Sequence, residues 1–186
     1  GTQTAGLAFG GGGVPTAPVA TEEYNGSSWA NGGNLGTGRA YLGGCGTQTA
    51  GLAFGGYVDG ASALTEEYGG TSWTAGGNLN TARWGLKGAG TQTAGLAFGN
   101  DGGTQTEEYN GSSWTNGGNM SVARRYMAGA GTQTAGLAAG GGPPITASTE
   151  EYNGSSWTNG GNLNSARTTL AGASLQTAAL AFGGQK

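Results

Sequence analysis

The side chains able to carry acid–base chemistry are few, and they recur at regular intervals. Paired glutamates precede a tyrosine four times along the 186 residues, beginning at Glu22, Glu66, Glu107 and Glu150. Two carboxylates can act as acid and base in glycoside hydrolysis. Adjacent residues of a strand point to opposite faces, however, so Glu22 and Glu23 cannot converge on one substrate. Because an active site occurs once and this pattern occurs in every copy, we predict no catalytic residues and no enzyme.

Composition restricts metal and nucleophile chemistry. The chain has no histidine and one cysteine, Cys45, so an internal disulfide is excluded and zinc, copper, Ser-His-Asp and Cys-His sites are disfavoured. Alanine takes the place of Cys45 in the other copies, which indicates a small packed residue. The segment 99–103 has one carboxylate, fewer oxygen ligands than calcium requires. We therefore predict no metal site and no cofactor.

Charge and hydropathy narrow the range of partners. Seven basic and ten acidic residues give a net charge of −3, and the basic residues form no run, which argues against nucleic acid. The sequence lacks an apolar stretch long enough to span a membrane. It begins with glycine and shows no signal-peptide pattern, so we expect a processed chain or a segment of a longer one. The 44 glycines suggest low complexity, but the small net charge and the fixed spacing of the tryptophans oppose disorder.

A tandem repeat organises the chain into one repeat domain. We assign repeats to residues 1–45, 46–89, 90–130 and 131–173, with a partial fifth copy at 174–186. A tryptophan and an arginine follow each glutamate pair at fixed distances: Trp29, Trp73, Trp114 and Trp157, and Arg39, Arg83, Arg124 and Arg167. All length variation falls in one connection, which has 9, 8, 5 and 7 residues at positions 12–20, 57–64, 101–105 and 142–148. We call this connection the variable loop.

Each copy reads as four short strands bounded by turn residues. In the first copy we expect strands at Thr4–Phe9, at Thr21–Tyr24, from Trp29 onward and at Arg39–Cys45. Asn25–Ser28 contains the Asn-Gly signal of a hairpin loop. Four strands in a period of about 40 to 50 residues are typical of a β-propeller blade.

A family resemblance rests on the order of residues within the copy. The order is a glycine pair, the variable loop, Glu-x-Tyr, tryptophan and arginine, in the first copy Gly10, Gly11, Glu22, Tyr24, Trp29 and Arg39. This pattern resembles the kelch repeat. The residue sequence of the copies is also similar to glycine-rich kelch-like repeats of predicted marine phage structural proteins. The resemblance implies an all-β, kelch-like β-propeller of four-stranded antiparallel blades.

Strand counting predicts how the ring would close. The chain opens at the second strand of a blade and ends with a first and a second strand, giving seventeen strands, whereas four blades need sixteen. We predict four blades, with Arg167–Ala173 completing the first blade beside an N-terminal strand, so that the termini interleave. One of the segments Thr2–Phe9 and Leu175–Phe182 is then redundant: spare, displaced, or lent to a neighbouring chain in a homo-oligomer.

The repeat-fixed tryptophans, arginines and glutamates are expected to be structural. A partly buried charge needs a partner, so one glutamate of each pair is expected to bond the repeat arginine within or between blades. The tryptophans are expected to pack between blades, the alternative being platforms for sugars. The glutamates assigned to this structural set are Glu23, Glu67, Glu108 and Glu151.

The copies disagree most in the variable loop and in the two residues after the repeat arginine. In a four-stranded meander both segments emerge on the same face, the pattern of a scaffold that presents a recognition surface. Unconstrained drift of loop sequences is the alternative explanation. The candidate ligand-binding residues on this variable face are Tyr41, Tyr57, Asp59, Trp84, Asp101, Arg125, Tyr126 and Ile145.

Two classes of function remain open. The first is a non-enzymatic structural or recognition module, a display domain of a phage virion or extracellular protein that binds glycan or protein through the variable face. The second is an intracellular, cytoplasmic kelch-like scaffold for protein–protein interaction. Aromatic and charged side chains on the variable face favour binding, since they supply contact area with little entropy to lose.

Overall fold

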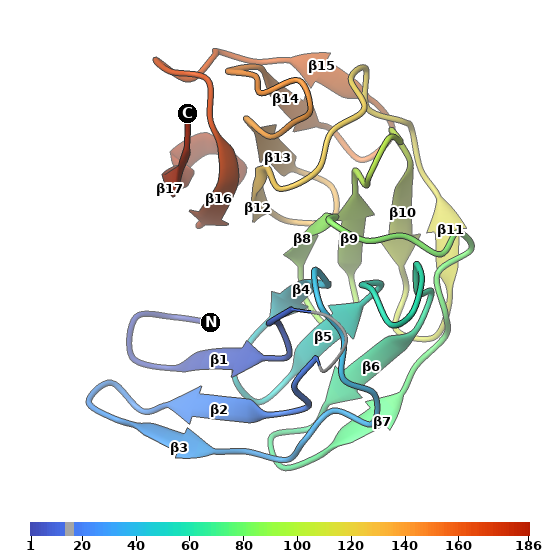
Figure 1. Cartoon of the computed structure of the whole chain (residues 1–186), viewed down its shortest axis with the longest axis vertical. Helices are drawn as coiled ribbons and strands as arrows, with labels where there is room; N and C mark the ends of the chain where they lie inside the picture. The colour runs from blue at the N-terminus through green and yellow to red at the C-terminus, as the bar shows by residue number, and fades with distance from the viewer. Residues whose placement is uncertain (14–16) are drawn as a thin grey trace.

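The computed structural model describes residues 1–13 and 17–186, and nearly all of its regular structure is β-strand (Figure 1). The described residues form seventeen strands, the number expected from the repeat, and one short 3₁₀ turn, η1 (Gln176–Ala178). Residues 14–16 of the first variable loop lie outside the described residues. In the described part there is no helix with the length and hydrophobicity needed to cross a bilayer.

Three antiparallel sheets have four strands each, hydrogen-bonded in chain order. The first consists of β4 (Gly43–Gly46), β5 (Gly51–Phe54), β6 (Thr65–Tyr68) and β7 (Trp73–Ala75). The second consists of β8 (Lys87–Gly90), β9 (Gly95–Phe98), β10 (Thr106–Tyr109) and β11 (Trp114–Asn116). The third consists of β12 (Ala128–Gly131), β13 (Gly136–Ala139), β14 (Thr149–Tyr152) and β15 (Trp157–Asn159). The sequence-based expectation of four-stranded antiparallel units is therefore confirmed.

The two ends of the chain form smaller sheets. The N-terminal sheet has three strands, β1 (Gly6–Phe9), β2 (Thr21–Tyr24) and β3 (Trp29–Asn31). The C-terminal sheet has two, β16 (Thr168–Ala173) and β17 (Leu180–Gln185). Compared with a four-stranded sheet, the N-terminal sheet lacks its first strand and the C-terminal sheet lacks its last two.

Local sequence explains the hairpins that join the outer strands. The Asn25 side-chain oxygen accepts hydrogen bonds from the backbone N–H groups of Ser27 and Ser28, both at 3.0 Å. Gly26 adopts a φ of 96°, which a glycine reaches without strain. This turn sets Tyr24 opposite Trp29 in the register of β2 and β3. The predicted hairpin is therefore present, and its equivalents in the third and fourth repeats use Asn110 and Asn153 in the same way.

Two strands of the first repeat begin later than the sequence predicts. The first starts at Gly6 rather than Thr4, and the fourth starts at Gly43 rather than Arg39. Arg39 is not part of this strand because the left-handed backbone of Tyr41, with a φ of 54°, interrupts the extended conformation between Arg39 and Gly43.

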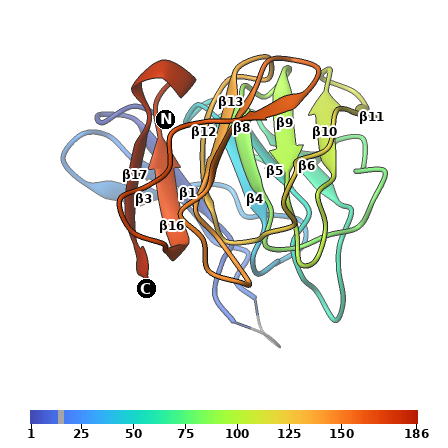
Figure 2. The same ribbon diagram turned by 90° about the horizontal axis from the view of Figure 1, so that it is seen from above.

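The sheets lie side by side in an arc (Figures 1 and 2). The strand direction turns along this arc, from β1–β3, which lie across the view, to the upright β8–β10 in Figure 1. Their first strands contact one another in sequence, β4 with β8, β8 with β12, and β12 with β16. We call these four strands the inner strands, since they line the concave side of the arc in Figure 1.

Aromatic packing joins neighbouring sheets where glycine allows close approach. The Phe54 ring of β5 lies against β8, and a Cβ atom at Gly88 would come within 2.4 Å of it. The Trp114 ring packs on Phe54 with the ring centroids 5.0 Å apart, and its Nε1 donates to Thr65 Oγ1 at 3.0 Å. Trp114 therefore lies between two sheets rather than on a free surface.

Buried ion pairs join the same sheets. Arg39, Arg83 and Arg124 are fully buried, and each pairs with a glutamate of the following repeat: Glu66, Glu107 and Glu150 at 2.8, 3.0 and 2.9 Å. The partner is thus the first glutamate of each pair, across the junction between sheets.

The second glutamates have a different partner. Glu23, Glu67 and Glu108 accept hydrogen bonds from the phenol groups of Tyr68, Tyr109 and Tyr152 in the following sheet. Burial, with help from this hydrogen bond, raises the pKa of Tyr109 and Tyr152 to about 12. Glu151, in the last four-stranded sheet, is exposed. At each of these three junctions one glutamate therefore bonds an arginine and another bonds a tyrosine. The expected pair with a glutamate is not formed by Arg167 among the described residues, and its Nη1 donates instead to Gly183 O at 3.3 Å.

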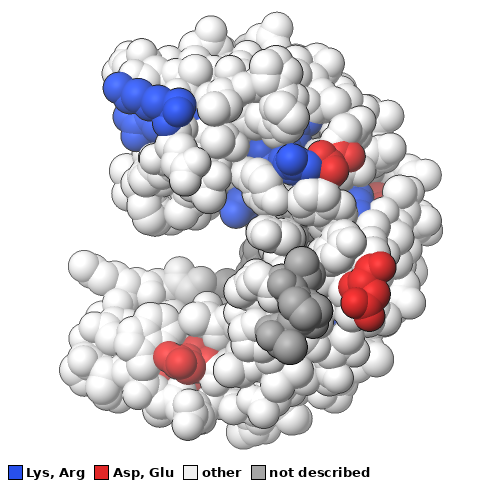
Figure 3. Space-filling view, in the orientation of Figure 1, with Lys and Arg blue, Asp and Glu red and all other residues white. Residues whose placement is uncertain are grey.

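The predicted interleaving of the termini is not formed. β16 pairs with β17, so that Ala171 lies opposite Phe182, and β1 is an edge strand paired with β2. The segments Thr2–Phe9 and Leu175–Phe182 both contribute a strand, β1 and β17 respectively, so neither segment is spare. β17 follows β16 after a short turn, and this local pairing costs less loop-closure entropy than reaching the N-terminus. The arc therefore stays open, and a notch separates its ends in the space-filling view (Figure 3).

Candidate recognition surface

The second residue after each repeat arginine has a left-handed backbone. The φ values are 54° at Tyr41, 72° at Gly85, 56° at Tyr126 and 60° at Thr169. Backbone hydrogen bonds link these positions across the sheets, from Gly85 N–H to Tyr41 O at 2.9 Å and from Tyr126 N–H to Gly85 O at 3.0 Å. Non-glycine residues in this region are strained, and such strain concentrates at ligand-binding sites.

Hydrogen bonds attach the second, third and fourth variable loops to the residue that follows the preceding repeat arginine. Ala40 and Tyr57 exchange two backbone hydrogen bonds, of 3.1 and 2.8 Å. Arg125 and Gly142 do the same at 3.0 Å each, and Asp101 N–H donates to Trp84 O at 3.2 Å. The two segments that differ most between repeats therefore share one surface.

Four aromatic side chains of this surface pack together. Trp84 lies 5.5 Å from Tyr41, 5.8 Å from Tyr57 and 6.1 Å from Tyr126, measured between ring centroids. Tyr41 and Tyr126 are 5.7 Å apart. We call Tyr41, Tyr57, Trp84 and Tyr126 the aromatic cluster. None of them occupies a position fixed by the repeat, so the cluster occurs once in the chain.

A cation covers the cluster from one side. The Arg125 guanidinium carbon lies 4.7 Å from the centre of the Trp84 ring and 5.1 Å from that of Tyr126. Arg125 also forms an ion pair with Asp101, and both side chains are partly exposed, so this pair adds little to stability. Burial is the main cause of the raised pKa of Tyr126, which Arg125 opposes. The pair holds the guanidinium over the rings.

The last two candidate residues lie in variable loops. Ile145 is exposed and lines a cavity of about 290 Å³ together with Arg125 and Tyr126. Asp59 is exposed in the loop that contains Tyr57. The structure thus brings seven of the eight candidates to the cluster or its border, and places Asp59 farther along its loop.

No family model and no curated protein matches this chain. Among the described residues, no group of three or more His, Cys, Asp or Glu side chains is arranged to hold a metal ion.

A cavity of about 370 Å³ opens beside the aromatic cluster, where the inner strands begin. It is lined by Tyr41, Leu42, Gly85, Leu86, Lys87, Tyr126 and Thr169, and we call it the inner-strand cavity. Sequence reasoning placed Tyr41 and Tyr126 at the surface but did not assign Lys87 or Thr169 to a site. The available signal was that Lys87 is one of only five charged residues outside the repeat-fixed positions.

Replacing Thr169 by glycine is expected to stabilise the protein by about 1 kcal/mol. Thr169 is an exposed, β-branched residue with a φ of 60°, a conformation that costs it about 1–2 kcal/mol, part of which the extra unfolded-state entropy of glycine offsets. Urea denaturation measures the change. Thr168→Gly, one residue earlier, is the control and should destabilise; equal losses in both variants would contradict strain at Thr169.

Proposed function

We propose that this chain is a non-enzymatic recognition module that binds glycans through the aromatic cluster. The observation that carries the proposal is that the four rings come from positions where the repeats differ, yet they pack into one surface capped by Arg125. A scaffold needs no such cluster, because its repeat-fixed tryptophans already fill the junctions between sheets.

The chemistry of the surface suits a saccharide. Aromatic rings offer flat apolar faces for the C–H faces of a sugar, and phenol and guanidinium groups offer hydrogen bonds to its hydroxyls. The two cavities beside the cluster measure about 290 and 370 Å³, near the lower end of the range for small-ligand sites. Tyr41 and Tyr126, which both have a left-handed backbone, line the inner-strand cavity at the border of this surface.

We further propose that the sheets are blades of a kelch-like β-propeller, displayed on a phage virion or an extracellular protein. The contacts between successive inner strands and the repeated junctions support the blade interpretation. A protein ligand on the same surface is the second candidate, favoured by the aromatic and arginine content typical of protein interfaces.

A glycan array tests the proposal, with Trp84→Ala as the variant. We expect wild-type protein to bind a defined set of glycans and Trp84→Ala to weaken that binding at least tenfold, since truncating a central aromatic anchor costs about 2 kcal/mol or more. Trp29→Ala is the matched control, because Trp29 is exposed on the N-terminal sheet, away from the cluster.

Three results would separate the alternatives. Equal loss in both tryptophan variants would show a general effect on folding and contradict the proposal. Absence of any glycan binding, combined with a protein partner lost on Trp84→Ala, would replace the glycan by a protein. Binding that ignores Trp84 would move the site away from the aromatic cluster.

A further inference from the structure

Lys87 is the unusual residue of the inner-strand cavity. It begins β8 opposite Phe98, and the residues at this register position in the other inner strands are Gly43, Ala128 and Ala171. The repeat thus requires only a small side chain here. A lysine at this point lines the cavity with a group that the fold does not need.

The positive charge of Lys87 has no counter-ion in the described part of the chain. Three of the repeat arginines pair with glutamates and Arg125 pairs with Asp101, but the ion pairs among the described residues do not include Lys87. Its side chain is half-buried, and burial lowers the pKa of its ammonium group with no opposing carboxylate. A half-buried cation without a partner costs free energy that an anion inside the cavity would offset.

The walls around Lys87 suit a ring-shaped ligand. Tyr41 and Tyr126 line the same cavity with their ring centroids 5.7 Å apart, and Leu42 and Leu86 add apolar surface. Thr169, in β16, adds a residue with a hydroxyl group to the same lining. The cavity therefore combines aromatic walls, hydroxyl groups and the Lys87 ammonium group, which pairs with no carboxylate among the described residues.

We propose that the inner-strand cavity binds an acidic saccharide, with its carboxylate on the Lys87 ammonium group and its ring against Tyr41 and Tyr126. This inference rests on the proposed glycan recognition and names the class of sugar. A charge-assisted hydrogen bond supplies the preference for acid over neutral sugar, and the aromatic walls supply the preference for a sugar over a simple anion.

The test is calorimetric titration of the full chain with matched methyl glycosides. Methyl glucuronide and methyl glucoside differ only in the carboxylate at C6, and acetate provides the carboxylate alone. We expect the glucuronide to bind at least about tenfold more tightly than the glucoside, because a hydrogen bond between charged groups contributes about 1.5–3 kcal/mol. Acetate should bind more weakly than the glucuronide.

Lys87→Met tests the residue itself. We expect glucuronide affinity to fall at least about tenfold while thermal stability is unchanged or higher, because the variant removes a half-buried charge and keeps an unbranched side chain only one heavy atom shorter. Lys87→Arg should retain part of the affinity, and Lys186→Met, at the C-terminus, should retain all of it. A merely structural lysine would instead lose stability and leave the sugar preference unchanged.

The outcomes distinguish the acidic-sugar assignment from the proposed glycan recognition by the aromatic cluster. Equal affinity for the two glycosides, no glucuronide binding, acetate binding as tight as glucuronide, or full affinity in Lys87→Met would each overturn the acidic-sugar assignment. Binding of neutral glycans that still depends on Trp84 would leave the proposed recognition function in place. Loss of the Trp84 dependence as well would overturn both.

Discussion

Replacing Glu107 by alanine is expected to destabilise the protein by about 3–5 kcal/mol, because it leaves a buried arginine without its counter-ion. Arg83 is 1% exposed, and its Nη2 donates to Glu107 Oε1 at 3.0 Å. The other carboxylate oxygen accepts from the backbone N–H of Asn80 at 2.7 Å. The substitution therefore breaks a charge pair and leaves a backbone donor unpaired at the junction of two sheets.

The repeat provides a matched control at Glu22. This residue holds the same position in the N-terminal sheet, but it is exposed and takes part in no ion pair among the described residues. Glu22→Ala should change the free energy of unfolding by no more than about 0.5 kcal/mol. Urea denaturation measures the free energy of unfolding of both variants, provided that its slope against urea concentration is unchanged. A similar large loss of this free energy in the two variants would contradict the exposed state of Glu22.

The individual repeat could be predicted well from the sequence because its signals are local. The Asn-Gly turn fixes the hairpin, and Thr21–Tyr24 and the start at Trp29 match β2 and β3. Which glutamate pairs with arginine could not be predicted, since alternation places the two carboxylates on opposite faces without saying which face meets Arg83. That choice depends on how neighbouring sheets are rotated against each other.

Closure of the ring was predicted wrongly, because a count of strands contains no information about competing partners. β1 and β17 carry the same Leu-Ala-Phe sequence, so either can pair with β16 by side-chain pattern alone. Chain connectivity decides the matter in favour of β17. In a repeat whose strands are interchangeable, the side-chain pattern therefore specifies the pairing partner of a strand only weakly.

The candidate site was predictable in its residues and not in its geometry. Differences between copies identified Tyr41, Trp84 and Arg125, because loops that are free of the repeat's packing rules can vary. The contact between these side chains depends on the left-handed backbone at the second residue after the arginine. A tyrosine at that position, unlike a glycine, gives no sequence signal for such a backbone. The position of Lys87 depends in turn on the approach of four inner strands that are about forty residues apart in the chain.

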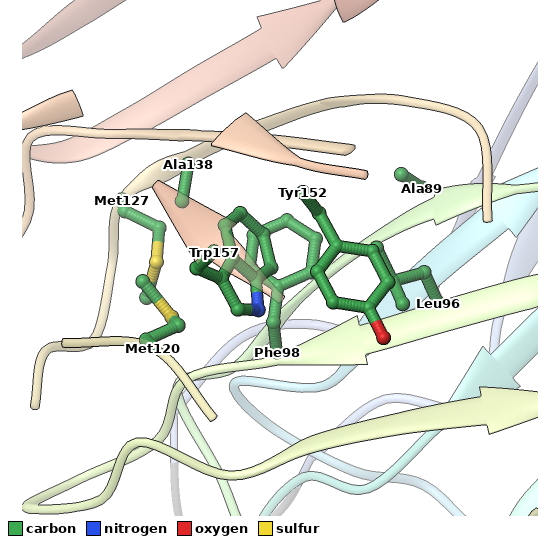
Figure 4. Packing of buried hydrophobic residues seen from close by; sticks show 8 residues of the cluster. All are labelled: Ala89, Leu96, Phe98, Met120, Met127, Ala138, Tyr152 and Trp157. Atoms are coloured by element: carbon green, nitrogen blue, oxygen red, sulfur yellow. The ribbon is translucent and has the colours of Figure 1, made fainter. Parts of the chain in front are cut away.

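Replacing Trp157 by alanine is expected to cost about 3–5 kcal/mol, the usual range for removing a buried aromatic ring. Trp157 is 9% exposed and packs with its ring centroid 5.0 Å from Phe98 and 5.1 Å from Tyr152 (Figure 4). Its Nε1 donates to Thr106 Oγ1 at 2.9 Å, and the variant leaves that buried hydroxyl without its donor. Thermal and urea denaturation provide the measurement.

Trp29 is the matched control, and it also reports on the ends of the arc. It occupies the same repeat position but is 52% exposed, because among the described residues no further sheet packs against this face of the N-terminal sheet. Trp29→Ala should therefore cost no more than about 1 kcal/mol. A cost as large as that of Trp157→Ala would mean that another sheet covers Trp29 in solution. Independence of protein concentration would then assign the cover to the C-terminal end of the same chain, and dependence would assign it to a second copy. If the arc is open in solution, Trp29 stays exposed and Trp29→Ala has only the small cost in unfolding free energy.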